Sequence, residues 1–181
     1  GVRTIQLAGY DVYYEEKSPQ TRQRFIKNLR KACDWAEEAQ VVLAIEIMDD
    51  SFINSIEKYL SVEKEIDSPY LFVYPDIGNV SAWHNDVYSE FYLGHHAIAA
   101  LHLKDTYAVT ENSKGQFRDV PFGQGCVKWE EAFDILKQTN YNGPFLIEMW
   151  SENCETVEET RAAIQEAQAF LYPLIKKAGL M

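Results

Sequence analysis

The sequence predicts a parallel α/β fold formed by a single domain over residues 1–181. Apolar runs of strand length alternate along the chain with stretches in which apolar residues recur at helical spacing. Most of these runs lack the polar alternation of a half-exposed strand, which is typical of parallel strands buried on both faces. A length of 181 residues suits one domain. Right-handed crossovers would then connect successive strands.

The elements are expected in the order β-α-β-α-β-α-β-loop-α-β-α. Apolar runs predict strands over 2–8, 41–48, 70–74, 98–105 and 144–150. Helical spacing predicts helices over 19–40, 51–66, 86–94, 128–139 and 157–177. Residues 105–127 are rich in glycine and polar residues, and they are predicted to form a long loop.

Particular residues mark the ends of two of these helices. Ser18-Pro19 is a typical helix start, because serine caps the first turn and proline fits within it. In the last helix, Pro173 is expected to bend the axis, and Gly179 follows the end.

The composition limits the partners that the protein can have. The chain carries 17 lysines and arginines against 28 aspartates and glutamates, which gives a net charge of −11. Sequence-independent nucleic-acid binding needs a basic face, and an anionic membrane surface would repel this chain. No apolar run approaches the ~20 residues of a membrane span. We therefore expect neither a nucleic-acid partner nor a membrane partner.

The cysteines and the lack of a signal peptide indicate the cellular compartment. Cys33, Cys126 and Cys154 form no CxxC pair, and an odd count indicates a reducing compartment without a disulfide framework. No signal peptide is visible, so we expect a cytoplasmic protein.

The chain begins with Gly1 rather than Met, and a strand pattern follows at once. This start indicates a chain cut from a longer one.

Four predicted strands carry a possible metal ligand near their carboxyl ends: Glu46, Asp76, His102 and Glu148. Each alone has a structural explanation, because a glutamate can pair with a buried cation, an aspartate can cap a turn and a histidine can bond a carbonyl. In parallel α/β folds, however, the carboxyl ends of the strands meet at one edge. Three buried acids there would repel one another, and a divalent cation would remove that repulsion. The ligand set suits Mn²⁺, Mg²⁺, Co²⁺ or Zn²⁺.

Two basic residues are candidates for binding a substrate. Strand alternation places Lys104 on the same side as His102, where it either faces the site or extends to the rim. Arg118 lies in the predicted loop, where it either binds a substrate hydroxyl or phosphate or is simply solvated. The sequence has no GxGxxG and no GxxxxGK[ST] motif, so nucleotide binding has no support.

The whole chain resembles the xylose-isomerase-like TIM-barrel superfamily. It is most similar to the group of L-ribulose-5-phosphate 3-epimerases, also called L-xylulose-5-phosphate 3-epimerases, of L-ascorbate degradation. The resemblance rests on the segments TIQLAGYDVYYE, LAIEIMD, YPDIGNVSAW, IAALHLKDT, GQFRDVPFGQGCVKW and FLIEMW. The family fold is a (β/α)₈ barrel. The five strands predicted here imply a partial barrel that lacks its first three strands, and its open edges would favour a homo-oligomer.

The resemblance also implies roles for the site residues. Glu46, Asp76, His102 and Glu148 would bind one divalent metal ion, and Glu46 and Glu148 would act as the acid/base pair. They would invert C3 of a pentulose 5-phosphate through an enediolate. Arg118 would contact substrate oxygens. Some relatives carry a histidine three residues after the metal-binding aspartate, but this chain has Asn79, so that role does not transfer.

Three other functions remain open at this stage. An aldose–ketose isomerase acting on a hexulose 6-phosphate would use the same ligands. A phosphodiesterase of the endonuclease IV type is disfavoured by the acidic charge. A partial barrel could also bind a sugar phosphate or a metal without catalysing a reaction.

Overall fold

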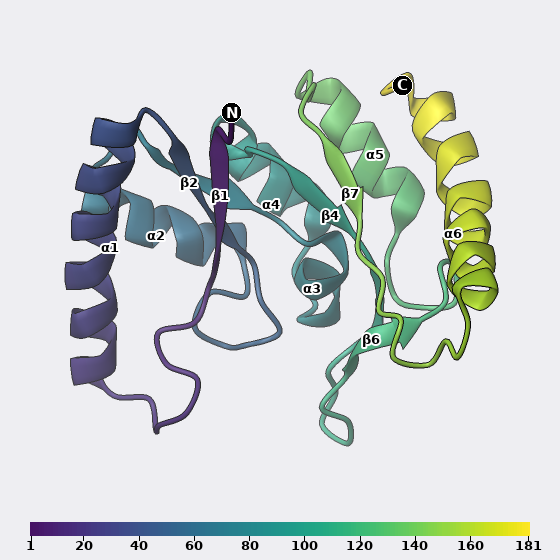
Figure 1. Ribbon diagram of the computed structural model, residues 1–181, viewed down its shortest axis with the longest axis horizontal. Helices are drawn as coiled ribbons and strands as arrows, with labels where there is room; N and C mark the ends of the chain where they lie inside the picture. Colours follow the sequence, from purple (N-terminus) through teal and green to yellow (C-terminus); the bar gives the residue numbers. More distant parts are fainter.

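Five parallel strands form the centre of the chain, and helices lie outside them (Figure 1). The computed structural model describes residues 1–181. The strands are β1 (Thr4–Ala8), β2 (Val42–Glu46), β3 (Leu71–Tyr74), β4 (Leu101–Leu103) and β7 (Phe145–Ile147). β1 pairs with β2, β2 with β3, and β4 with β7, while single parallel bridges join Val73 to Ile98 and Asp76 to His102. The prediction of five parallel strands is confirmed, in the spatial order β1-β2-β3-β4-β7.

Each long helix packs against the next one along the outside of the strands. The helices are α1 (Pro19–Ala39), α2 (Ile56–Ile66), α3 (Ile77–Ala82), α4 (Val87–Gly94), α5 (Trp129–Gln138) and α6 (Val157–Ala178). Contacts link α1 to α2, α2 to α4, α4 to α5, and α5 to α6. A short 3₁₀ turn, His95–Ala97, follows α4. None of these helices combines the length and the apolar character needed to cross a membrane.

Side-chain caps fix where the helices begin. Ser18 and Thr21 cap α1 reciprocally: each side-chain oxygen accepts a hydrogen bond from the other residue's backbone N–H. This confirms the start predicted at Ser18-Pro19. α6 continues through Pro173, and Gly179 (φ 72°) ends it in the left-handed conformation that glycine adopts readily. α2 begins five residues later than predicted because Ser55 is its cap and accepts from the Lys58 N–H at 3.1 Å.

The prediction of a continuous loop over 105–127 was wrong. Within it, β5 (Asp105–Tyr107) and β6 (Gln116–Val120) form an antiparallel hairpin. β6 is mostly exposed and polar, so it lacks the apolar run that revealed the buried strands. The six-residue helix α3 was also not predicted. Asp76 caps it by accepting from the Asn79 N–H at 2.8 Å.

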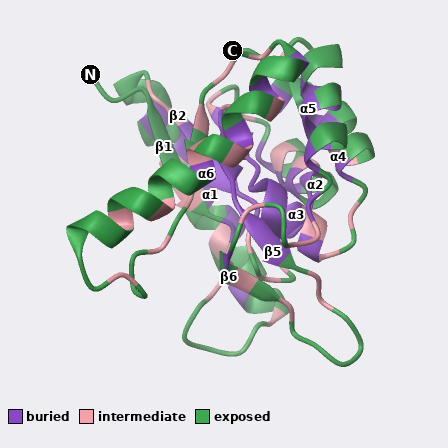
Figure 2. Cartoon of the chain, turned by 90° about the vertical axis from the view of Figure 1, so that its right-hand side faces the viewer, coloured by how far each residue is buried: buried purple, intermediate pink, exposed green.

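The core lies between the strands and the helices, where the buried residues gather (Figure 2). Burial on both faces, predicted for most strands, holds for the three inner strands β2, β3 and β4 but not for the two edge strands. Ile5 of β1 is 42% exposed and Leu146 of β7 is 46% exposed, because each strand has a neighbour on one side only. The expectation of self-association rests on these two open edges.

One buried carboxylate fixes the segment that follows the hairpin. Asp105 is 1% exposed and accepts hydrogen bonds from the N–H groups of Gly123 (2.8 Å), Gly125 (3.2 Å) and Val127 (3.3 Å), and from Trp129 Nε1 (3.4 Å). A Cβ at Gly125 would lie 2.0 Å from Asp105 Oδ1, so only glycine allows this close approach. Asp105 therefore holds the 123–127 turn against the end of β4.

We expect Asp105→Asn to destabilise the chain, because an amide places N–H donors where the turn also presents N–H donors. The expected loss in the free energy of unfolding is about 3 kcal/mol. Urea denaturation followed by circular dichroism measures it. The exposed α5 residue Asp134 offers a control, since Asp134→Asn should change stability by less than about 0.5 kcal/mol. Equal stability of the two variants would contradict this role of Asp105.

Candidate functional site

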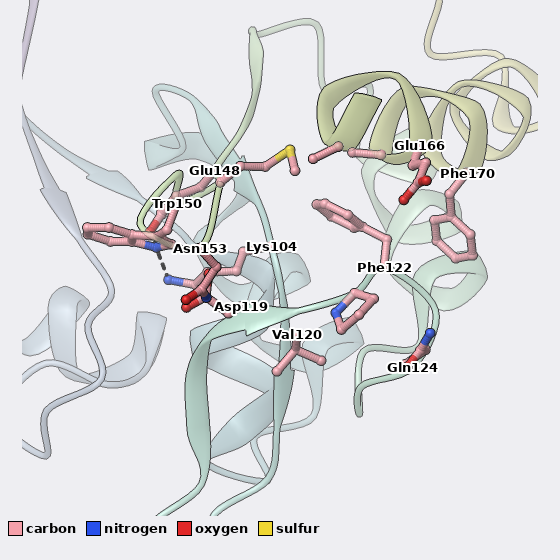
Figure 3. A pocket seen from close by; sticks show the side chains of 14 residues that line it. Lys104, Asp119, Val120, Phe122, Gln124, Glu148, Trp150, Asn153, Glu166 and Phe170 are labelled. Atoms are coloured by element: carbon pink, nitrogen blue, oxygen red, sulfur yellow. Dashed lines mark hydrogen bonds and ion pairs between the residues drawn. The ribbon is translucent and has the colours of Figure 1, made fainter. Parts of the chain in front are cut away.

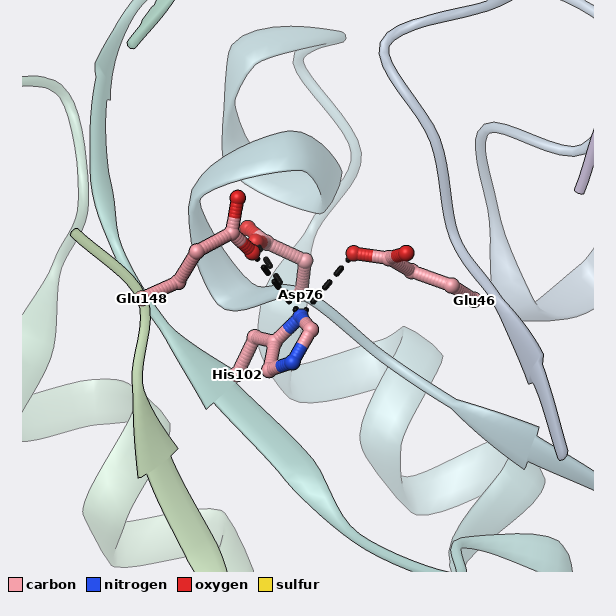
Figure 4. A group of neighbouring side chains, drawn as sticks. All are labelled: Glu46, Asp76, His102 and Glu148. Carbon is pink, nitrogen blue, oxygen red and sulfur yellow. Dashed lines mark hydrogen bonds and ion pairs between the residues drawn. The ribbon is translucent and has the colours of Figure 1, made fainter. Parts of the chain in front are cut away.

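The structure brings the four predicted ligands together at the carboxyl ends of the strands (Figure 4). Glu46 is the last residue of β2, Asp76 follows β3, His102 lies within β4, and Glu148 follows β7. One ligand atom from each lies within 4.8 Å of the others. Parallel pairing causes this convergence, because it sets the ends of four strands side by side at one edge.

His102 lies between the two glutamates (Figure 4). Its Nδ1 is 2.9 Å from Glu46 Oε1, 2.9 Å from Glu148 Oε2 and 3.9 Å from Asp76 Oδ2. A ring nitrogen carries one proton at most, so it can serve only one of these carboxylates well at a time. Tyr74 packs on the imidazole, with ring centroids 4.6 Å apart, and limits its movement.

Lys104 faces the site and does not extend to the rim. Its side chain is buried, and Nζ lies 3.0 Å from Asp76 Oδ2 and 3.1 Å from Glu148 Oε1. Of the two orientations left open by the sequence, the structure therefore adopts the inward one. Lys104 ties together two of the four predicted ligands.

Burial and charge move the pKa values of the cluster in different directions. Burial opposes ionisation of Glu148, but His102 and Lys104 outweigh it and lower the pKa of Glu148 to about 2. Burial also disfavours the charged imidazole, but hydrogen bonds and charges from Glu148 and Glu46 raise the pKa of His102 to about 9. For the fully buried Asp76, burial outweighs the attraction of Lys104 and raises the pKa to about 7.

The donor set fits a divalent cation. Asp76 Oδ2 and Glu148 Oε2 are buried and accept no well-aligned hydrogen bond, although Lys104 and His102 lie within ion-pair distance. Buried carboxylate oxygens without aligned donors are costly, and a bound cation satisfies them directly. Three carboxylates and one imidazole are ligands that Mn²⁺, Mg²⁺, Co²⁺ and Zn²⁺ accept.

A cavity of about 340 Å³ opens beside the cluster. Glu46, His102, Lys104 and Glu148 line it, and Arg118 of β6 lies at its wall, above the ring of Trp150. The cavity therefore contains both basic residues that the sequence proposed for substrate binding.

A second cavity of about 420 Å³ lies between the segment after β7 and α6. Lys104, Glu148 and Trp150 line one side of it, and Glu166 and Phe170 of α6 line the other (Figure 3). The two cavities lie side by side, since Lys104, Glu148 and Trp150 line both of them.

Sequence reasoning missed several residues of the site. Gln6 of β1 donates a hydrogen bond to Glu46 Oε2 at 2.7 Å, and it was recognisable as a polar residue inside an apolar strand. The Tyr10 hydroxyl donates to Asp49 at the cavity wall. The amide of Asn79 donates to the carbonyl of Ile47 at 2.9 Å. No local pattern marks these last two contacts, because each joins segments that are far apart in the sequence.

Comparison with known proteins places the chain in a family. The model of the family described as "Xylose isomerase-like TIM barrel" matches residues 1–174. SgbU of Haemophilus influenzae is 52% identical over the whole chain, and L-ribulose-5-phosphate 3-epimerase UlaE of Escherichia coli O157:H7 is 46% identical. The chain spans 62% and 61% of the length of these relatives.

Solved structures share the fold at lower sequence identity. An L-ribulose 3-epimerase superimposes with a TM-score of 0.76 at 18% identity, covering 97% of this chain and 62% of the other. A xylose isomerase domain protein from Planctomyces limnophilus gives a TM-score of 0.75 at 20% identity, covering 98% of this chain and 60% of the other. The match of the family model over nearly the whole chain, together with this shared fold, shows that the chain belongs to the xylose isomerase-like TIM-barrel family.

Proposed function

We propose that this chain carries the catalytic site of a metal-dependent 3-epimerase that interconverts L-ribulose 5-phosphate and L-xylulose 5-phosphate. The observation that carries the proposal is the placement of Glu46 and Glu148 on either side of His102, with one ligand atom of each inside the same 4.8 Å cluster. The name of the 46% identical relative, L-ribulose-5-phosphate 3-epimerase, supports this choice of substrate. A place in L-ascorbate degradation would follow from it.

A single divalent ion held by Glu46, Asp76, His102 and Glu148 would supply a Lewis acid beside the carbonyl of the substrate. The remaining chemistry belongs to the chain itself. One glutamate removes the proton from C3 to give an enediolate, and the other returns a proton to the opposite face. Two carboxylates are needed, because a single base on one face would restore the original configuration.

Neighbouring side chains orient the two glutamates. Gln6 Nε2 donates to Glu46 Oε2 at 2.7 Å, and Lys104 Nζ holds Glu148 Oε1 at 3.1 Å. In each glutamate the other oxygen, Glu46 Oε1 or Glu148 Oε2, lies 2.9 Å from His102 Nδ1. Each carboxylate thus has one oxygen fixed from outside and one directed at the centre of the site.

We expect Mn²⁺ to stabilise the chain against heat. Binding to the folded state alone would add about 2.7 kcal/mol at a metal concentration of 100 times Kd. Differential scanning fluorimetry with EDTA reversal measures this shift. Asp76→Asn and His102→Gln should remove it, while Asp34→Asn on the exposed face of α1 should keep it. A full Mn²⁺ shift in both site variants would contradict the metal assignment.

Lys104→Met is expected to destabilise the chain in the absence of metal, because Asp76 and Glu148 would lose their shared cation. Removing one partner from a buried ion pair costs about 3 kcal/mol. Since a divalent ion would replace the lost charge, saturating Mn²⁺ should narrow the gap between the variant and the parent chain. Urea denaturation with and without metal tests this. A gap that stays the same with metal would show that Lys104 and the ion do not share these carboxylates.

Glu46→Gln and Glu148→Gln should each slow epimerisation at C3 by about 100-fold or more, because glutamine cannot accept the proton. The variant that lacks the base facing the C3 proton of L-xylulose 5-phosphate should also lose the exchange of that proton with D₂O. Proton NMR of L-xylulose 5-phosphate follows the exchange, in this chain and in the full-length Haemophilus influenzae relative with the matching substitutions. Glu166→Gln on α6 is the control, since Glu166 lines only the second cavity. Unchanged exchange in both site variants would exclude the two-base mechanism.

The same NMR assay separates the epimerase from the other candidates. An aldose–ketose isomerase acting on a hexulose 6-phosphate would exchange the proton on C1 and C2 and yield an aldose. A chain that binds metal but exchanges no substrate proton would be a binding module. L-Ribulose 5-phosphate as the sole product supports the proposal.

A further inference from the structure

The hydrogen bonds of His102 do not by themselves fix the direction of its ring. Its Nδ1 lies 2.9 Å from both Glu46 Oε1 and Glu148 Oε2, so two carboxylates compete for one nitrogen. Histidines that bind metals usually donate the second ring N–H to a carboxylate or a carbonyl, which fixes the plane of the ring. Within this chain only Nδ1 of His102 has a hydrogen-bond partner, so the plane of the ring depends on packing.

Tyr74 supplies that packing. Its ring centroid lies 4.6 Å from that of His102, with 53° between the two planes, and Tyr74 is 5% exposed. The torsion that turns an imidazole about its Cβ–Cγ bond is intrinsically soft, so a neighbouring group must restrict it. In a close-packed interior a turned imidazole would overlap the tyrosine ring, and Tyr74 therefore restricts this rotation.

The neighbouring segments leave room for the ring of Tyr74. Tyr74 ends β3 and pairs in register with Glu46 of β2. Ala44 and Ala100 are buried and pack with Tyr74 in one small cluster. Because the side chain of an alanine ends at Cβ, the tyrosine ring can extend between these segments and reach His102, two residues after Ala100.

The ring of Tyr74, rather than its hydroxyl, makes the contact with His102. The hydroxyl of Tyr74 makes no hydrogen bond within the chain, whereas the hydroxyl of the buried Tyr59 donates to the carbonyl of Leu71 at 3.0 Å. The backbone of Tyr74 is fixed separately, because its carbonyl accepts from the N–H of Ile47 at 3.2 Å. A phenylalanine at position 74 should therefore preserve the contact, and an aliphatic side chain should not.

We infer that Tyr74 is a positioning residue that keeps Nδ1 of His102 directed at Glu46 and Glu148. The consequence for a metal ion rests on the metal-dependent function proposed above. The direction of the ring is already set in the metal-free chain, so it can be measured without metal or substrate.

The first experiment records the imidazole N–H protons of the metal-free chain by NMR. A proton held between His102 Nδ1 and a carboxylate should exchange slowly with water and give a resolved downfield signal, which His102→Gln assigns by removing it. Tyr74→Phe should keep this signal. Tyr74→Leu should lose it, and so should Tyr74→Met, which keeps more of the side-chain volume and serves if Tyr74→Leu does not fold.

The second experiment measures Mn²⁺ affinity by isothermal titration calorimetry. Tyr74→Leu and Tyr74→Met should weaken binding by about tenfold, which is typical when a residue that orients a metal ligand is lost. Tyr74→Phe should stay within about twofold of the parent.

Phe72→Leu is the matched control for both experiments. Phe72 precedes Tyr74 by two residues in β3 and packs on the same small cluster, but its ring forms no pair with His102. This variant also loses an aromatic ring from β3, yet it should keep the Nδ1 signal and stay within about twofold of the parent in Mn²⁺ affinity. Urea denaturation of the metal-free variants compares their losses of stability.

Three results would overturn the inference: no slowly exchanging Nδ1 proton in the parent, a signal that persists in Tyr74→Leu and Tyr74→Met, or a signal lost equally in Phe72→Leu. The first would show that the ring is not held, the second that another contact holds it, and the third that general packing is responsible. If the signals follow the expected pattern but the parent binds no Mn²⁺, the proposed metal-dependent function fails while the role of Tyr74 stands.

Discussion

The balance of charge at the strand ends is the constraint on which the site depends. Asp76, Glu46 and Glu148 share one largely buried space, and only His102 and Lys104 stand among them as cations. Like-charged carboxylates at this separation repel strongly, so the metal-free chain needs both cations in place. A bound divalent ion would neutralise part of this negative charge in place of His102, whose Nδ1 lies at the centre of the cluster. The carboxylates that His102 and Lys104 hold together are therefore the groups that a divalent cation would bind.

The extended segment of β4 and the residues after it connect this site to the rest of the fold, because its side chains point to two sides. His102 and Lys104 point into the site, while Asp105 turns away from it and holds the turn of residues 123–127. Alternation along one extended segment therefore serves the metal cluster on one side and the loop on the other. Because the hairpin of β5 and β6 starts at Asp105, the same segment also sets the place from which Arg118 reaches the cavity.

The sequence revealed the parts of the fold and site that local patterns encode. Five apolar runs predicted the strands, and the polar residue near the end of four of them predicted the cluster, since parallel strands must end at one edge. The hairpin of β6 and the short helix α3 left no such pattern. β6 is polar and exposed, and α3 has six residues, too few for helical spacing to appear. The direction of Lys104 and the contact of Arg118 with Trp150 depend on packing between distant segments, which no single segment records.

The position of Arg118 makes the charge differ from one side of the cavity to the other. Carboxylates occupy the end formed by the strands, and the one unpaired guanidinium lies on the wall formed by β6 and Trp150. A ligand with an anion at one end and hydroxyl groups along its length would lower its energy by placing the anion on the arginine and the hydroxyl-bearing carbons near the carboxylates. Binding in the reverse orientation would set that anion against three acids. Electrostatics alone would therefore keep the anionic end of such a ligand away from Glu46 and Glu148.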